Sequence, residues 1–190
     1  MISRFAEKAV DYYTQNGTIP MGDKDLYIYG FFLLFSNVFF FTLTAFFGFL
    51  FHIPLESMLF YFMFAVIRSY AGGLHASKES ICTVSTAITL LLSVSIIHFL
   101  EQNNLIISPL VTIFFCLIVI GILAPVDSEE KRLTKQERQK YKKKSIVIGA
   151  VIACIGIILY NRSNIFYSST VTLVLESLLL ILGKFKTHKI

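Results

Sequence analysis

The chain has 190 residues, of which 55% are hydrophobic and only 15% are charged. Soluble domains have about 45–50% apolar and about 25% charged residues, so this composition argues against a soluble globular domain, a disordered chain or a nucleic-acid-binding module. The net charge is +5, and the basic residues that produce it are unevenly distributed. The three cysteines are widely spaced, which excludes a fully paired disulfide framework and any CxxC metal pair.

The first 25 residues favour an amphipathic helix on the cytoplasmic surface. Phe5, Ala9 and Tyr12 recur at spacings of three and four, with charged residues between them, and a helix with this pattern can lie in the membrane interface. A polar lead-in explains so short a pattern equally well. The mixed charges argue against a secretory signal, so hydrophobic helices are expected to direct membrane insertion.

Long uncharged runs predict six transmembrane helices. A helix needs about 20 apolar residues to cross the hydrocarbon core, and Leu26–Leu55, Ser80–Leu100 and Gln102–Val126 provide them, with weaker runs between and after. No period-2 alternation indicates a barrel. The expected fold is therefore all-α, a polytopic integral membrane protein with a single membrane domain over residues 1–190. The expected helices cover residues 27–51, 54–71, 81–100, 105–125, 145–160 and 165–183.

The basic residues predict the orientation of these helices. Sixteen of the 17 Lys and Arg residues fall on one side of the six-span arrangement, and Arg162 alone falls on the other. By the positive-inside rule, both termini and the 68–80 loop face the cytoplasm, together with a basic loop over residues 127–144. This loop could attract an acidic peptide tail, bind anionic lipid or only fix the topology. Its cations include Lys131, Arg132, Lys142, Lys143 and Lys144.

The stretch from Arg68 to Cys82, at the cytoplasmic end of two helices, is the candidate site. A cysteine nucleophile needs a base or a positive field. His75 can supply the base, and the N–H groups of a helix first turn would favour the Cys82 thiolate. Seven residues on a straight helix would separate the two side chains by about 10.5 Å along the axis. A working pair therefore requires a bend.

Glycine and serine residues beside His75 permit this bend. Gly72 and Gly73 precede the histidine and Ser77 follows it, and all three are typical of turns. The glycine pair would also let backbone N–H groups approach a developing oxyanion. Ser77 or Ser80 could cap the helix that follows.

Other interpretations of these residues remain open. Taken alone, Cys82 could be a small apolar side chain and His75 a solvated one. Arg68 could hold a substrate carboxylate or phosphate, or could anchor the positive side of the membrane. A zinc site would need further ligands that the neighbouring sequence does not supply, so neither a metal nor a cofactor is expected.

Three residues inside the predicted spans have simpler expected roles. Cys116 and Cys154 lie in mid-span, where apolar surroundings disfavour a thiolate, so both are expected to be inert packing. Glu176 interrupts the last apolar run. A carboxyl group is costly in lipid, so Glu176 should face other helices.

The stretch resembles the AgrB (accessory gene regulator B) family of integral membrane cysteine endopeptidases, which process quorum-sensing peptide precursors. The resemblance rests on Arg68, Gly72-Gly73, His75-Ala76 and Cys82, and on Ala124-Pro125-Val126-Asp127 followed by a charged segment. It covers essentially the whole chain and implies a location in the bacterial cell membrane. It implies that Cys82 is the nucleophile and His75 the general base and acid. Arg68, Gly72, Gly73, Ser77 and Glu79 are then candidates for substrate or oxyanion contacts.

The resemblance also implies the substrate and partners. The substrate would be an AgrD-like precursor peptide with an amphipathic leader, a central Cys or Ser and an acidic tail. Cys82 would cleave before the tail, and the peptide's own Cys or Ser would close a thiolactone or lactone ring. Membrane lipids and a homodimer partner fit the family, whereas nucleic acid does not. A polar residue that family members carry after a glycine in the first span is absent after Gly30, with Asn37 as a candidate replacement.

Two rival functions remain from the sequence. A non-catalytic peptide exporter or scaffold would tolerate changes at Cys82 and His75. An enzyme acting on lipid headgroups would need clustered carboxylates, and the acids of this chain are scattered.

Overall fold

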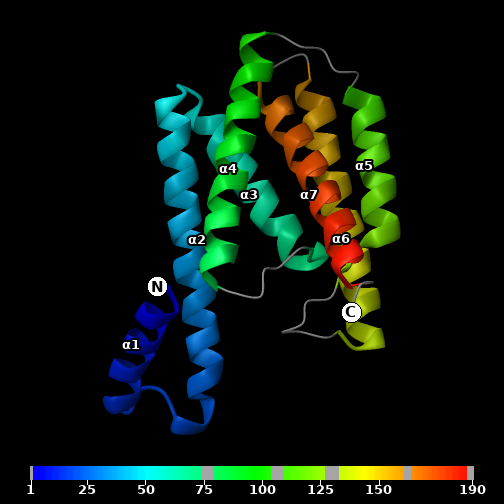
Figure 1. The fold of residues 1–190 in the computed structure, drawn as a ribbon. Coiled ribbons are helices and arrows are strands. Elements are labelled where there is room, and N and C mark those ends of the chain that lie inside the picture. The colour runs from blue at the N-terminus through cyan, green and yellow to red at the C-terminus, as the bar shows by residue number, and fades with distance from the viewer. Residues whose placement is uncertain (1, 74–78, 104–108, 127–132, 161–163, 188–190) are drawn as a thin grey trace. The chain divides into compact units, whose positions relative to one another are not determined.

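The computed structural model describes residues 2–73, 79–103, 109–126, 133–160 and 164–187. Within these residues the chain forms helices and no strand, which confirms the predicted all-α class. Figure 1 shows the helices in chain order. They fall into two compact units, unit 1 over Met1–Leu43 and unit 2 over Thr44–Ile190.

Unit 1 contains α1 (Ile2–Gln15), the short 3₁₀ helix η1 (Met21–Asp23) and most of α2 (Lys24–Leu50). The predicted amphipathic helix is present as α1, but it ends well before residue 25 because the chain turns at Gly17, whose φ is 71°. Asp11 of α1 forms a salt bridge of 2.7 Å with Lys24. The rings of Tyr13 and Phe31 lie 6.1 Å apart, so α1 contacts the start of α2 by both charge and aromatic packing.

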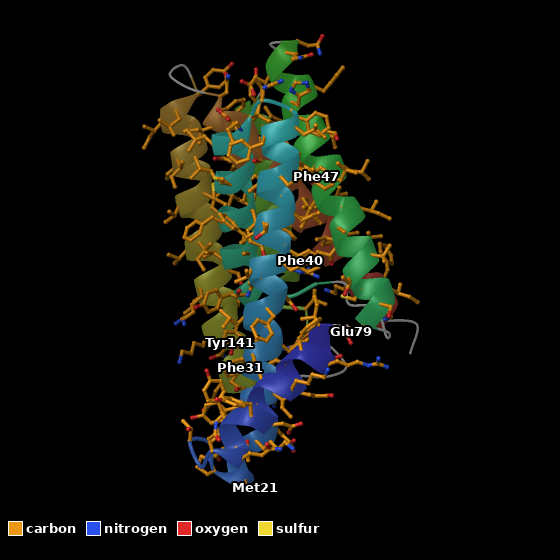
Figure 2. All side chains as sticks on the ribbon, turned by 90° about the vertical axis from the view of Figure 1, so that its left-hand side faces the viewer. Met21, Phe31, Phe40, Phe47, Glu79 and Tyr141 are labelled. Carbon is orange, nitrogen blue, oxygen red and sulfur yellow. The ribbon has the colours of Figure 1, made fainter. Side chains whose placement is uncertain are left out.

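Helix α2 runs without a break from Lys24 to Leu50 and carries many of the chain's phenylalanines. Figure 2 shows Phe31, Phe40 and Phe47 at successive levels along it. Most of its large apolar side chains are exposed. An apolar helix of this length that is not covered by protein is suited to contact with lipid.

Unit 2 contains α3 (Pro54–Ala71), α4 (Glu79–Gln102), α5 (Pro109–Leu123), α6 (Lys135–Leu159) and α7 (Ile165–Thr187). The bounds of α3 match the prediction, with Pro54 at its first turn and Gly72 after its end. Helix α6 starts at Lys135 rather than near residue 145. Thr134 and Glu137 form a capping box there, so the described part of the expected basic loop is helical instead.

Helix α7 is the central helix of unit 2 and packs against α3, α4, α5 and α6 (Figure 1). Its buried face is rich in small hydroxyl side chains, several of which donate to carbonyls one turn earlier. The apolar residues around it form one core cluster, with side chains from α3, α5, α6 and α7 and from Val126. The ends of α3 and α5, where the candidate site lies, contribute residues to this cluster.

Three helical segments are long and apolar enough to cross a membrane, namely Met21–Leu50, Glu79–Gln102 and Ile165–Lys186. The apolar part of α5, Val111–Leu123, is shorter. Helix α3 carries Glu56 and Arg68, and α6 begins with a run of cations. Three of the six predicted spans are therefore clearly supported. The other helices are short or carry charged residues.

The exposed side chains of α4 are typical of a lipid-facing helix. They form an apolar stripe at helical spacing that a water-soluble protein would bury. The stripe consists of Ile81, Val84, Ile88, Leu92, Ile96 and Phe99.

We expect Gly48→Ala to destabilise unit 2. A Cβ at Gly48 of α2 would collide with the buried side chain of Ser57 and approach the Pro54 Cα to 3.1 Å. Overpacking of this kind costs about 1–3 kcal/mol. Circular dichroism of the protein heated in detergent should show a lower unfolding temperature. Gly121→Ala is the matched control, because a Cβ there meets nothing within 4 Å and alanine favours a helix by about 0.5–1 kcal/mol. Equal unfolding temperatures for the two variants would contradict the packing described.

Candidate functional site

The candidate site begins where α3 ends. Gly72 follows the helix with φ 74° and ψ −143°, and Gly73 has φ 128°. Residues with a side chain rarely adopt such angles. The N–H of Gly72 donates to the Arg68 carbonyl at 3.1 Å, so this group caps the helix in the structure rather than pointing into a site as an oxyanion donor.

The end of α3 is joined to the segment that follows α5. The Val126 N–H donates to the Ala71 carbonyl at 3.0 Å, and Gly72 and Val126 form a parallel β-bridge. A Cβ at Gly72 would collide with the Val126 carbonyl oxygen. Glycine is therefore needed at position 72 both for its backbone angles and for the close approach of the second chain segment.

Arg68 reaches over this junction from the last turn of α3. Its side chain is half-buried, and Nη1 donates to the Gly72 carbonyl oxygen. A Cβ at Gly73 would overlap the same Nη1 atom. The guanidinium thus occupies the space that the second glycine leaves open, and it holds the glycine pair from the side.

Glu176 of α7 is the buried acid of unit 2. It is fully buried, as its place in an apolar run predicts. Its carboxylate oxygens make no hydrogen bond within the described part of the chain. Arg68 is near enough for its charge to act on this carboxyl group. Arg68 therefore binds the glycine pair through a hydrogen bond, and its charge also acts on Glu176 of the central helix.

Cys82 lies on α4, half-buried, four residues into a helix that begins at Glu79. Its N–H is thus among the first four of the helix, which have no carbonyl partner within it. Ser80 lies inside the helix and is not its cap, contrary to one expectation. Glu79 opens the helix and its carbonyl accepts a hydrogen bond from Thr83 Oγ1 at 2.9 Å.

Several predicted site residues fall outside the described residues. His75 and Ser77 lie in the segment 74–78, and Lys131 and Arg132 lie in 127–132. Of the other two cysteines, Cys116 is buried and Cys154 is exposed on α6. Burial fits the predicted packing role of Cys116, whereas Cys154 faces outward from an apolar helix.

The first turns of α6 pack beside the end of α3. The Tyr70 and Tyr141 rings are 5.9 Å apart, and Lys144 Nζ lies 4.6 Å from the centre of the Tyr70 ring. A cation over an aromatic face is attracted by the ring's negative surface. Lys142 and Lys143 are exposed on the same turns. Lys142, Lys143 and Lys144 are therefore on a helix that contacts the end of α3.

The described cations of unit 2 gather at one end of it. The C-terminal ends of α3, α5 and α7 and the N-terminal ends of α4 and α6 all lie at this end (Figure 1). It includes Arg68, Cys82 and the α6 cations, together with Lys184 and Lys186 in the last turn of α7. We call it the basic end of unit 2.

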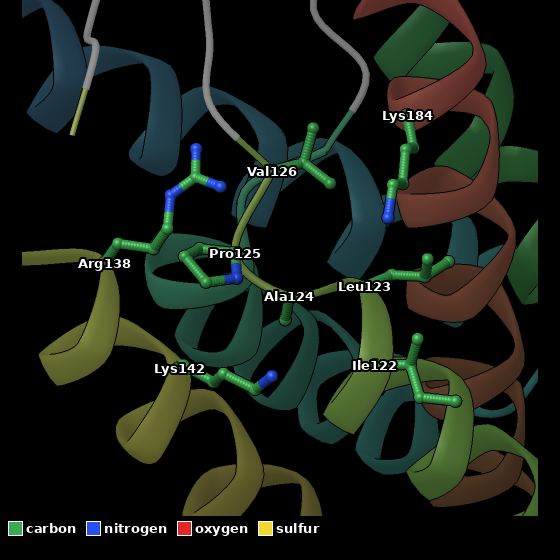
Figure 3. A pocket seen from close by; sticks show the side chains of 8 residues that line it. All are labelled: Ile122, Leu123, Ala124, Pro125, Val126, Arg138, Lys142 and Lys184. Atoms are coloured by element: carbon green, nitrogen blue, oxygen red, sulfur yellow. The ribbon is translucent and has the colours of Figure 1, made fainter. Parts of the chain in front are cut away.

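A pocket of about 260 Å³ opens at the basic end (Figure 3). The apolar part of its lining comes from the end of α5 and the segment after it, and three cations complete the lining from α6 and α7. The lining residues are Ile122, Leu123, Ala124, Pro125, Val126, Arg138, Lys142 and Lys184. Lys142 was among the cations predicted from the sequence, whereas Arg138 and Lys184 were not, because nothing in a linear pattern brings α7 next to α6.

Three comparisons relate the chain to known proteins. The family model described as AgrB, accessory gene regulator B, matches residues 6–180. An AgrB-like protein 2 of Clostridium perfringens strain 13 is 26% identical over 150 residues, which cover 74% of this chain and 70% of that protein. An AgrB-like protein of strain SM101 is 27% identical over 72% of this chain and 68% of its own length. No solved structure matches the chain.

We expect Gly72→Ala to destabilise the protein more than Gly17→Ala does. Both glycines have a φ near 70°, but a Cβ at Gly17 meets nothing within 4 Å, whereas one at Gly72 collides with Val126. The backbone angle alone costs roughly 1–2 kcal/mol, and the collision adds to this at Gly72 only. Size-exclusion chromatography after stepwise heating in detergent measures both losses. A Gly72→Ala protein as stable as Gly17→Ala would contradict the junction with Val126.

Proposed function

Because the chain belongs to the AgrB family, which implies a role in processing the peptide signal of an agr quorum-sensing system, we propose that it is a membrane cysteine endopeptidase. It removes the C-terminal tail of an AgrD-like precursor peptide and closes the remaining peptide into a ring. The observation that carries this proposal is the position of Cys82, half-buried in the first turns of α4 at the basic end of unit 2.

The proposed reaction has two acyl transfers. His75 accepts the thiol proton of Cys82, and the thiolate attacks the carbonyl carbon of the peptide bond before the tail. The carbon–nitrogen bond breaks, and the histidine returns the proton to the leaving amine. The acyl group is then held as a thioester on Cys82. The peptide's own Cys or Ser attacks this thioester, which forms a thiolactone or lactone and regenerates the Cys82 thiol.

In this proposal the residues around the glycine pair fix the point at which the chain leaves α3, shortly before His75. Arg68 and Val126 bind the carbonyls of Gly72 and Ala71, so the chain leaves α3 in a fixed direction just before residue 75. Gly72 then contributes a turn rather than an oxyanion donor, since its N–H is used by the Arg68 carbonyl. Gly73, Ser77 and Glu79 remain candidates for contacts with the substrate.

The proposed arrangement in the bacterial cell membrane follows from the basic end of unit 2. With six spans and both termini in the cytoplasm, this end faces the cytoplasm by the positive-inside rule. Cys82 then meets the precursor on the side where it is synthesised. The cations of α6, including Lys143 and Lys144, face the same side and attract an acidic peptide tail.

We expect Cys82→Ala to abolish processing, whereas Cys116→Ala and Cys154→Ala retain it. The reason is that only Cys82 lies near a helix start, while Cys116 is buried and Cys154 lies within an apolar helix. Mass spectrometry of a precursor peptide co-expressed with each variant should show, for the active proteins, loss of the tail and a mass one water below that of the linear fragment.

Two results of this experiment would contradict the proposal. A cyclised product made by Cys82→Ala would show that Cys82 is not the nucleophile. Export of an uncleaved peptide by both the wild type and Cys82→Ala would support a non-catalytic exporter instead.

We also expect Cys82 to react with a charged, water-soluble thiol reagent faster than the other two cysteines. In this proposal the helix dipole at the start of α4 favours a negative charge on the attacking sulfur, and His75 adds a base. Double variants that keep one cysteine each allow the three rates to be compared at neutral pH. His75→Ala should slow the reaction of Cys82 about tenfold or more, whereas His188→Ala, in the C-terminal tail, should not. Equal rates for all three cysteines would argue against an activated nucleophile.

A further inference from the structure

The pocket at the basic end combines two kinds of surface. Three of its lining residues are cations, namely Arg138 and Lys142 of α6 and Lys184 of α7, and the described residues that line it include no acid. The rest of the lining is apolar and runs from Ile122 to Val126. Figure 3 shows the three cationic side chains arranged around the backbone of this apolar segment. A ligand that fits both parts of the lining must be an anion joined to an apolar group.

The apolar part of the lining continues into the outward face of α5. Ile122 lines the pocket and is 66% exposed. The side chains at helical spacing before it are exposed as well, so an apolar stripe leads from the middle of α5 to the pocket. The stripe consists of Val111, Phe114, Phe115, Ile118 and Ile122.

We propose that this pocket binds the headgroup of an anionic phospholipid, with the phosphate between the three cations and the acyl chains along the stripe on α5. Basic pockets on the cytoplasmic side of helical membrane proteins are suited to such headgroups. Arginine also offers the paired donors that a phosphate accepts. An acidic peptide or a free phosphate would use the cations but would leave the apolar stripe without a role. The continuity between pocket and stripe therefore favours a lipid.

This inference does not depend on the proposed peptidase reaction. Cys82 and Glu79 belong to α4, which contributes nothing to the lining of the pocket. A lipid bound there would brace α5, α6 and α7 against one another at the end that also holds the Gly72–Val126 junction. Loss of the lipid site would lower the stability of unit 2 without removing the nucleophile.

Native mass spectrometry of the full chain in detergent tests the proposal. The wild type is titrated with phosphatidylglycerol and with phosphatidylcholine of the same acyl chains. The triple variant Arg138→Gln, Lys142→Gln, Lys184→Gln removes the pocket cations. The control Lys135→Gln, Lys140→Gln, Lys143→Gln removes the same charge from exposed positions of α6 that do not line the pocket.

We expect one tightly bound phosphatidylglycerol on the wild type and on the control. The triple variant should bind it roughly 100-fold more weakly, since each of the three cations contributes a factor of roughly five. Phosphatidylcholine should bind equally weakly to all three proteins. If the triple variant does not elute as a monodisperse protein, Lys142→Gln against Lys143→Gln gives the same comparison with an expected factor of about five.

Three results would overturn the proposal. Equal losses in the triple variant and the control would show that only net charge matters. Displacement of phosphatidylglycerol by inorganic phosphate at the same concentration would assign the pocket to free phosphate. Displacement by a hexaglutamate peptide at a lower concentration than the lipid would assign it to an acidic peptide. The Cys82→Ala protein is titrated alongside, and its binding of phosphatidylglycerol should equal that of the wild type because Cys82 does not line the pocket, which keeps the two proposals separate.

Discussion

The backbone contact between Gly72 and Val126 is the constraint on which the candidate site depends. It ties the end of α3 to the end of α5, and both helices pack on α7. The chain therefore leaves α3 toward residue 75 from a fixed point. The two sequence segments that carry the family resemblance, around Gly72 and around Pro125, are thus one structural feature. Neither could be altered in backbone conformation without displacing the other.

Arg68 and Glu176 add a charge relation to this backbone contact. A buried carboxyl group costs several kcal/mol unless another group compensates for the lost water. Arg68 compensates in part, and its guanidinium is at the same time bound to the Gly72 carbonyl. The central helix therefore interacts electrostatically with the residue that holds the glycine pair.

The helix bounds were predicted well where a proline or glycine coincides with the end of an apolar run. Pro54 and Gly72 bracket α3, and its bounds were predicted correctly. The start of α6 was missed because counting uncharged residues ignores the helix that extends beyond the apolar run; the Thr134–Glu137 capping box is the signal that could have found it. The position of Cys82 near the start of a helix was predicted from the local pattern. The pocket was not, since Arg138 and Lys184 are brought together only by the packing of α6 on α7.

The place of α7 in the chain has a consequence for synthesis. It is the last of the described helices to leave the ribosome, yet it is the one against which α3, α4, α5 and α6 all pack. The earlier helices must enter the membrane before α7 is there to cover the faces that pack against it. Premature termination before Ile165 would remove α7 alone, but its effect would extend to the helices that pack on it. It would leave α3, α4, α5 and α6 without the helix on which they all pack. Arg68 would also lose its interaction with Glu176.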